Sequence, residues 1–414
     1  MSEIIAIAMA STIIIVGFIC NYFFEKTGFP DMLLLIILGM VLGKLIPFVM
    51  PEFQLANIME LAPYLAALAL IFILFDGGIK MNIFQVFAES PRAVVLAVTN
   101  FILSVLAVTL FMHYVVGPFV GGIDIIKSAL FGAIYGGSSS IAIVSLAQKI
   151  KISERCSTIL SLESAITDIL CIVVTLAIIE IILGGNQAGA VDVGRSIAAR
   201  FSIGAVVGVI FGIFWLSILR KVAKLPYAYM LTLGVLLFAY SISEYLEGSG
   251  ALSCLLFGIV LGNEREINRM LKRERPSLTV VDIGFRRFEE EIAFLIRSFF
   301  FVYLGLIVVG LGLSLATILW GIILSFILLF VRYAGVVLAT AKSELVAEKP
   351  VMWVLLTRGL AAAVLSTIPM QHIDKFGSEL SNLYIQIAVV IILVTAVICT
   401  LGTYLISKKK ETQL

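Results

Sequence analysis

The chain has 414 residues, of which 61% are hydrophobic and only 14% are charged. Soluble domains average about 25% charged residues. With a mean hydropathy of +1.12, the composition excludes an ordinary soluble protein and predicts an all-α integral membrane protein with many spans. The net charge of +2 gives no sign of a nucleic-acid partner. The five cysteines fall in or beside apolar runs and are expected to pack there without forming disulfides.

Apolar stretches of about 17–25 residues bounded by charge, Pro or Gly predict thirteen spans. The first is expected to remain as a permanent helix, because the start of the chain lacks the basic segment of a secretory signal. The ninth is short and is expected to be tilted, extended or partly re-entrant. The predicted spans run near 3–24, 32–49, 58–78, 92–117, 126–148, 157–184, 197–219, 226–246, 249–262, 288–310, 313–341, 350–371 and 383–407.

The loops between these spans differ strongly in basic charge. Of the 29 Lys and Arg residues, 21 fall in one set of loops and five in the opposite set. Cytoplasmic loops retain basic residues, so an odd number of spans places the N-terminus outside and the C-terminus in the cytoplasm. We expect a multi-pass protein of the cell membrane whose residues 408–414 form a short cytoplasmic tail.

Residues 1–407 are expected to form a single transmembrane domain with internal repeats. The first repeat covers about 1–184, a linker helix about 197–219, and the second repeat about 226–407. A polar insertion from 263 to 290 mixes basic, acidic and apolar residues, and its part 263–287 is interpreted as a cytoplasmic connector. Either it contacts anionic headgroups or a regulatory partner, or it is an ordinary loop helix.

The sixth span carries two carboxylates, Glu163 and Asp168, in the middle of the apolar run from about 156 to 184. An ionised side chain at mid-bilayer costs roughly 2.5–3.5 kcal/mol on insertion scales, so such residues usually mark an ion or proton pathway. In a helix Ser164 stacks one turn from Asp168, and Glu163 one turn from Thr167. Carboxylates and hydroxyls are hard oxygen ligands, and one carboxylate can hold either a proton or a cation.

Three arginines, Arg297, Arg332 and Arg358, also lie inside apolar spans. At 1.5 Å rise per residue, Arg358 and Arg297 fall at nearly the same depth as Glu163. Because an arginine in hydrocarbon needs a carboxylate partner, we expect Glu163 to form a structural ion pair with Arg358 or Arg297. Asp168 is then left as the titratable group. The alternative is that all of these charges are structural ion pairs.

The fifth span contains Gly136-Gly137-Ser138-Ser139-Ser140, and Gly359 follows Arg358 in the twelfth. Glycine weakens a helix, and broken helices at the bilayer midplane offer carbonyls and helix ends to bound ions. The hydroxyls and backbone of Ser138 and Ser139 are therefore candidate cation ligands. Close packing of helices through small residues would explain the same pattern.

Taken together, these stretches resemble the cation:proton antiporter superfamily, most closely its sodium/proton exchanger branch. The order and spacing of the segments carry the resemblance, which covers most of the chain. The matching segments are Phe29-Pro30-Asp31 before a helix with Gly39 and Gly43, Leu70 to Gly78, Gly132-Ala133-Ile134, Leu162-Glu163-Ser164 with Asp168, Arg297 with Phe301 to Gly305, and Arg358-Gly359.

The resemblance implies two inverted six-helix repeats, crossed discontinuous fifth and twelfth helices, and a homodimer. It also implies that Asp168 alternately binds a proton and a cation, that Ser164, Ser138 and neighbouring groups coordinate the cation, and that Glu163 with Arg358 supports the site. No cofactor is implied, because Na⁺, K⁺ or Li⁺ and H⁺ are the transported substrates.

Two positions depart from the family pattern. Thr167 stands where relatives usually carry Asn or Asp, and Ser138-Ser139-Ser140 replaces a Thr-Asp-Pro stretch. With no second acid beside Asp168, we expect electroneutral exchange of one proton per cation. The missing acid at Ser139 makes a preference for potassium more reasonable than the motifs alone suggest.

Other functions on the same sequence are a cation channel or a sodium-coupled solute carrier. A carrier of organic solutes would need a second, larger site. An intramembrane serine hydrolase would need a base near Ser138, yet His113 and His372 are both predicted near outer ends of spans, and no His-Glu-x-x-His motif is present. We therefore do not expect an enzyme.

Overall fold

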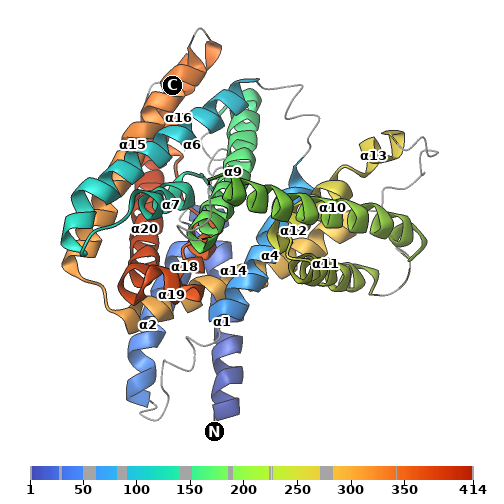
Figure 1. Ribbon diagram of the computed structural model, residues 1–414. Coiled ribbons are helices and arrows are strands. Elements are labelled where there is room, and N and C mark those ends of the chain that lie inside the picture. Colours follow the sequence, from blue (N-terminus) through green and yellow to red (C-terminus); the bar gives the residue numbers. More distant parts are fainter. Residues whose placement is uncertain are drawn as a thin grey trace. The chain divides into compact units, whose positions relative to one another are not determined.

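A computed structural model describes residues 2–27, 30–49, 62–81, 91–139, 152–184, 190–222, 225, 227–270, 283–341 and 343–412 (Figure 1). Within these ranges every regular element is a helix, which confirms the all-α prediction. Each predicted span overlaps one or more helices of the described residues, but the fifth and twelfth are interrupted at 136–139 and 355–359. Residues 58–61 of the third span, 140–148 of the fifth and 226 of the eighth lie outside the described residues.

Among the described residues, seven helices are long and apolar enough to cross a membrane. This agrees with a multi-pass membrane protein. Four shorter apolar helices in the same part of the chain cover Ala10–Phe24, Ile125–Tyr135, Gly250–Gly262 and Leu360–Gln371. The long ones are α6 with its continuation (Pro91–Phe119), α9 (Glu154–Gly184), α10 (within Ala190–Val222), α11 (Ala228–Tyr245), α14 (Ile283–Leu311), α15 (Leu315–Thr340) and α20 (Ser378–Thr412).

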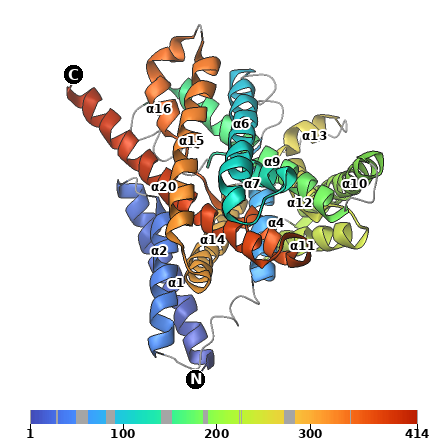
Figure 2. The same ribbon diagram turned by 60° about the vertical axis from the view of Figure 1, so that its left-hand side comes forward.

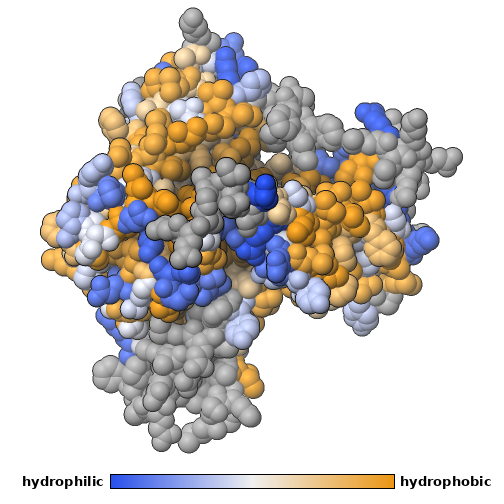
Figure 3. Space-filling view, viewed as in Figure 1, coloured by the Kyte–Doolittle hydropathy of each residue, from blue (hydrophilic) through white to orange (hydrophobic). Residues whose placement is uncertain are grey.

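The side chains on the outside of these helices are largely apolar. Phe18, Phe214 and Phe330 are 66%, 60% and 75% exposed, and apolar residues cover wide areas around α6 and α15 and around α10 and α11 in Figure 3. Exposed aromatic side chains on this scale would be unfavourable in water, whereas lipid tails accommodate them. The surface therefore agrees with membrane insertion.

One compact unit of the chain contains residues 1–66, 90–178 and 297–414. In it α6 packs on α15 and on α7 (Ile125–Tyr135), α15 packs on α20, and α1 (Ser2–Thr27) packs on α2 (Asp31–Val49). Figures 1 and 2 both show α15 beside α20. An apolar core joins α6, α9, α15, α16 (Lys349–Val354) and α20 through residues such as Leu96, Leu160 and Met352. This unit also contains every residue of the predicted site.

A second compact unit contains residues 67–89 and 179–296. Here α10, α11 and α12 (Gly250–Gly262) pack together. α12 is the short ninth span, and the hydroxyl of Ser249, the residue before it, caps the helix by accepting a hydrogen bond from Leu252 N. α13 (Glu264–Met270) follows and begins the predicted connector, of which residues 271–282 lie outside the described part.

Two helices of the first unit end at the glycine-containing stretches that were expected to interrupt a helix. α7 ends at Tyr135 and the chain is non-helical from Gly136 to Ser139; Ser140 lies outside the described residues. α16 (Lys349–Val354) has only six residues and ends inside the predicted span 350–371. After five non-helical residues that include Gly359, α17 (Leu360–Leu365) begins. These interruptions expose backbone groups that would otherwise be bonded within a helix.

Candidate functional site

The two helix interruptions meet in the first unit. Ser139 N donates a hydrogen bond to Thr357 O at 2.7 Å. Gly359 allows this approach, since a methyl group at that position would come within 2.6 Å of Ser139 Oγ. Two stretches of chain more than 200 residues apart in the sequence are thereby bonded directly through their backbones.

α9 supplies the side chains that bond to the first interruption. Ser138 N donates to Thr167 Oγ1 at 3.2 Å, and Ser164 Oγ donates to Ser138 O at 2.5 Å. Ser138 Oγ donates to Glu163 Oε1 at 3.0 Å. All three polar groups of Ser138 are therefore bonded to α9, and the three side chains on α9 replace the helical bonds that the interruption removes.

Thr167 has a clear role in this arrangement. Its hydroxyl accepts from Ser138 N and donates to Ser164 O at 3.1 Å, and its side chain is fully buried. A buried backbone N–H without a partner costs about 1–3 kcal/mol. The departure from the family pattern at Thr167 thus provides a hydrogen-bond acceptor for the interrupted helix.

Glu163 is held by an arginine other than those predicted. Arg332 Nη1 and Nη2 lie 3.0 and 3.1 Å from Glu163 Oε1 and Oε2, which is a two-pronged pair, and Arg332 Nε donates to Met352 O at 2.8 Å. Both residues are fully buried. The expectation that Glu163 pairs with Arg358 or Arg297 is therefore corrected: a planar guanidinium on α15 matches both oxygens of the carboxylate.

Arg358 and Arg297 have other partners. The fully buried Arg358 donates through Nη1 to Gly137 O, while its own backbone N–H donates to Thr395 Oγ1 of α20. It therefore binds the carbonyl side of the first interruption rather than the carboxylate. Arg297 Nη2 lies 3.3 Å from Asp31 Oδ2 at the start of α2.

Asp168 differs from Glu163 in burial. It lies one turn beyond Ser164 on α9, is half-buried where Glu163 is fully buried, and lies within electrostatic range of Arg358 and Cys171. A carboxylate that keeps some access to its surroundings while charged groups and broken helices lie nearby is suited to exchange a small ligand.

The available ligand atoms are oxygens. In the described part of the chain no group of three or more His, Cys, Asp or Glu side chains could hold a metal ion. Ser164 lies one turn from Asp168 on α9, and its hydroxyl bonds to the carbonyl oxygen of Ser138. A carboxylate, a hydroxyl and carbonyls suit a hard monovalent cation rather than a transition metal.

The structure separates the two candidate serines. Ser138 belongs with Glu163, Ser164 and Thr167, whereas Ser139 lines a small pocket with Asp31 and Arg297. The partner role of Arg332 was not predicted from the sequence, and Asp31 was named only within the Phe29-Pro30-Asp31 segment, without a role in the site. A signal for Arg332 existed, because it lies about as far from the end of its span as Arg358 and Arg297 do from theirs.

Residues 11–409 match the transmembrane sodium/hydrogen exchanger family. The chain belongs to this family. The predicted resemblance is thereby confirmed at the family level.

Several curated proteins are similar in sequence. The chain is 24% identical over 406 residues to the K⁺/H⁺ antiporter NhaP of Alkalimonas amylolytica, covering 95% of this chain and 64% of that protein. It is 27% identical over 391 residues to the K⁺/H⁺ antiporter NhaP2 of Shewanella sp. strain MR-4, covering 90% and 61%. The chain thus spans less than two thirds of the length of these relatives.

A solved structure has a similar fold over its full length. The sodium proton antiporter MjNhaP1 of Methanocaldococcus jannaschii at pH 8 matches with a TM-score of 0.76, covering 99% of both chains at 20% sequence identity. At that identity the match describes the fold alone.

Proposed function

We propose that this protein is a secondary active antiporter that exchanges a monovalent cation, Na⁺, K⁺ or Li⁺, for H⁺. Its family membership supports the class of reaction. The observation that carries the proposal is the unequal treatment of two carboxylates on one helix: Glu163 is fully buried and neutralised by Arg332, while Asp168 is half-buried beside the helix interruptions.

In the proposed mechanism Asp168 binds a proton and a cation in competition. When Asp168 is ionised, its carboxylate, Ser164 Oγ and the Ser138 carbonyl coordinate the cation, and protonation removes the charge that holds the ion. Glu163 with Arg332 and Arg358 with Gly137 O keep the interruptions in place. Cation affinity therefore falls as the pH is lowered through the pKa of Asp168.

We propose an electroneutral exchange of one proton per cation. Thr167 is a hydroxyl rather than a second acid, and Glu163 is already paired with Arg332. Two relatives of this chain are called K⁺/H⁺ antiporters, and Ser139 lacks the carboxylate that the family often carries at the interruption. Potassium is therefore included among the proposed substrates.

The architecture proposed for the transport cycle has thirteen membrane helices in two inverted repeats, with residues 126–148 and 350–371 as crossed discontinuous helices. The full-length likeness to an antiporter fold supports this. One bundle moves against the other so that Asp168 faces the two sides of the cell membrane in turn. We further propose a homodimer with its C-terminus in the cytoplasm.

The purified 414-residue protein in proteoliposomes tests the function. A pH-sensitive dye inside the vesicles should report proton efflux when Na⁺, K⁺ or Li⁺ is added. Choline should cause no proton efflux. If none of the three cations moves protons, the proposal is wrong.

A channel or a sodium-coupled solute carrier is distinguished in the same vesicles. In a sodium assay with equal potassium on both sides, valinomycin holds the membrane potential at zero, and electroneutral exchange should run at the same rate with and without it. A large current in planar bilayers would instead indicate a conductive pathway.

A further inference from the structure

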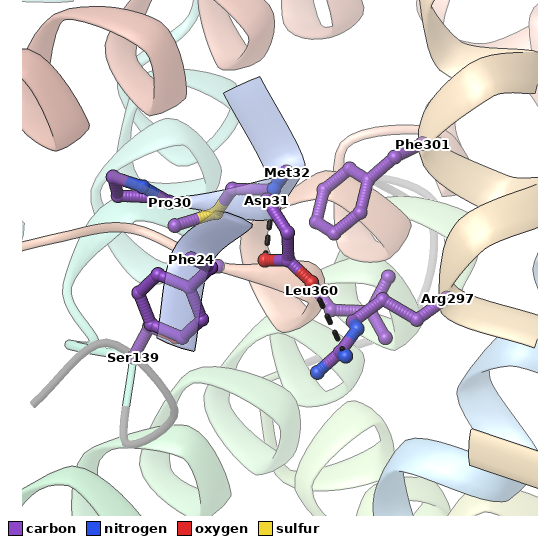
Figure 4. Close-up of a pocket in the computed structure, with 9 residues that line it drawn as sticks. Phe24, Pro30, Asp31, Met32, Ser139, Arg297, Phe301 and Leu360 are labelled. Atoms are coloured by element: carbon purple, nitrogen blue, oxygen red, sulfur yellow. Dashed lines mark hydrogen bonds and ion pairs between the residues drawn. The ribbon is translucent and has the colours of Figure 1, made fainter. Parts of the chain in front are cut away.

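A small pocket lies on the side of the interruption occupied by Ser139. It is lined by residues of α1, α2 and α14 and by both interrupted stretches, and it has room for about one water molecule (Figure 4). In the figure the Asp31 carboxylate points toward the Arg297 guanidinium. Ser139 and Gly359, from the two interruptions, belong to the same lining.

The non-helical stretch after α7 therefore has an ion pair on each of two sides. Ser138 bonds to Glu163 of the Glu163–Arg332 pair, and its neighbour Ser139 shares a pocket with Asp31 and Arg297. The Asp31–Arg297 pair has no part in the mechanism described above. Its position next to Ser139 puts two opposite charges beside the peptide that bears the Ser138 carbonyl.

The two pairs differ in how well they are satisfied. Glu163–Arg332 is two-pronged and fully buried. Asp31–Arg297 is a single contact of 3.3 Å, with side chains 6% and 15% exposed. Asp31 Oδ1 accepts from Met32 N, but within the described residues Asp31 Oδ2 and Arg297 Nε have no hydrogen-bond partner. A buried pair with unmet hydrogen bonds opens more easily than a fully bonded one.

The backbone beneath the Asp31–Arg297 pair is closely packed. Gly39 of α2 and Gly305 of α14 face each other, and a methyl group on either would overlap the backbone of the other helix. Each glycine lies two helical turns from its helix's member of the pair, so Asp31 and Arg297 lie on the faces that pack together. The side chains can separate while the helices stay in place.

We propose that Asp31 and Arg297 set cation access to the exchange site, with Asp31 attracting the cation and Arg297 opposing it. This inference rests on the proposed antiport. Within the pocket the two charges balance, so removal of either leaves a net charge beside the interruptions. An uncompensated charge in a water-poor site changes local cation concentration on the order of tenfold.

The test compares the apparent KM for the cation and the maximal rate in proteoliposomes. Arg297→Gln should lower the apparent KM about tenfold, and Asp31→Asn should raise it about tenfold, each with a small change in maximal rate. The double variant should return to the wild-type KM. Arg200→Gln, which removes the arginine that pairs with Glu180 in the second unit, is the matched control and should leave the KM unchanged.

A purely structural pair would behave differently. It would lower the melting temperature and the maximal rate in both single variants without moving the KM in opposite directions, and that result would overturn the inference. If Arg297→Gln does not fold, Asp31→Asn decides alone, because an asparagine can still accept from Met32 N; an unchanged KM then rejects the inference. Wild-type protein without exchange, or active Asp168→Asn protein, would instead reject the proposed function.

Discussion

Glu163 and Asp168 lie only five positions apart on α9 but have different surroundings. Glu163 is fully buried and bonds to Arg332 and Ser138, whereas Asp168 is half-buried. The desolvation cost of a buried carboxylate is offset only when its oxygens are bonded and its charge is balanced. Glu163 is therefore suited to stabilising the site, and Asp168 to exchanging a proton and a cation.

The Glu163–Arg332 pair should be needed for stability. Glu163→Gln leaves Arg332 buried and uncompensated, which typically costs about 3–5 kcal/mol. We expect a clearly lower melting temperature in detergent. Glu180→Gln on the same helix is the control, since its pair with Arg200 is partly exposed and should contribute about 0–1 kcal/mol. Equal melting temperatures for the two variants would show that the buried pair has no special role.

Thr167 should support transport through its hydroxyl. Thr167→Val keeps the shape but leaves Ser138 N without an acceptor, so we expect a loss of about 1–3 kcal/mol and a severalfold slower exchange. Thr167→Ser should restore both. The rate of proton flux and the melting temperature of the two variants check this, and a valine variant with the wild-type rate would refute it.

Residue chemistry explains how far the site was predictable. Glu163 and Asp168 were predicted as site residues because charge in an apolar span is visible in the sequence, and Ser164 because it lies one helical turn from Asp168. The pairing of Glu163 with Arg332 rather than Arg358 could not be predicted in this way, because three arginines lie at similar depth and only packing decides which helix faces α9. The hydrogen bond from Ser138 N to Thr167 likewise depends on contact between distant segments.

At the scale of elements, the interruptions of α7 and α16–α17 are the parts proposed to place cation ligands. Sequence predicts them well, since glycine and serine clusters weaken helices wherever they occur. Their contact is not predictable in this way, because the bond between Ser139 N and Thr357 O joins residues 218 apart in sequence. α12 was predicted to be short from the length of its apolar run, and it has 13 residues.

The approach of the two interruptions should depend on the absence of a side chain at position 359. A methyl group there would meet Ser139 Oγ at 2.6 Å and Cβ at 2.8 Å. We expect Gly359→Ala to slow exchange severalfold, since the backbone angles at 359 tolerate alanine and only the contact is disturbed. Adding Ser139→Gly should recover much of the rate. A double variant no faster than Gly359→Ala would contradict this explanation.

At the scale of the whole molecule, composition predicted an all-helical membrane protein, and the family match agrees. The division into two interleaved units could not be read from the sequence, because each unit collects segments that are far apart along the chain. Orientation is still a prediction from the 21 basic residues on one side against five on the other.

A reporter fused after residue 414 checks this orientation. A fluorescent protein that folds only in the cytoplasm should be bright, and an alkaline phosphatase that is active only outside should be silent. The opposite pattern would require either an even number of spans or a reversed topology. Reporters fused after shorter segments would then locate the error.

The proposed exchange depends on one carboxylate, Asp168, that holds either a proton or a cation. The most direct measurement is proton release from purified protein in weakly buffered detergent solution when Na⁺ or K⁺ is added. We expect saturating cation to release about half a proton per protomer at a pH equal to the pKa of Asp168 and close to one at a lower pH, none with choline, and none from Asp168→Asn. Cation-dependent proton release that persists in a folded Asp168→Asn variant would contradict it.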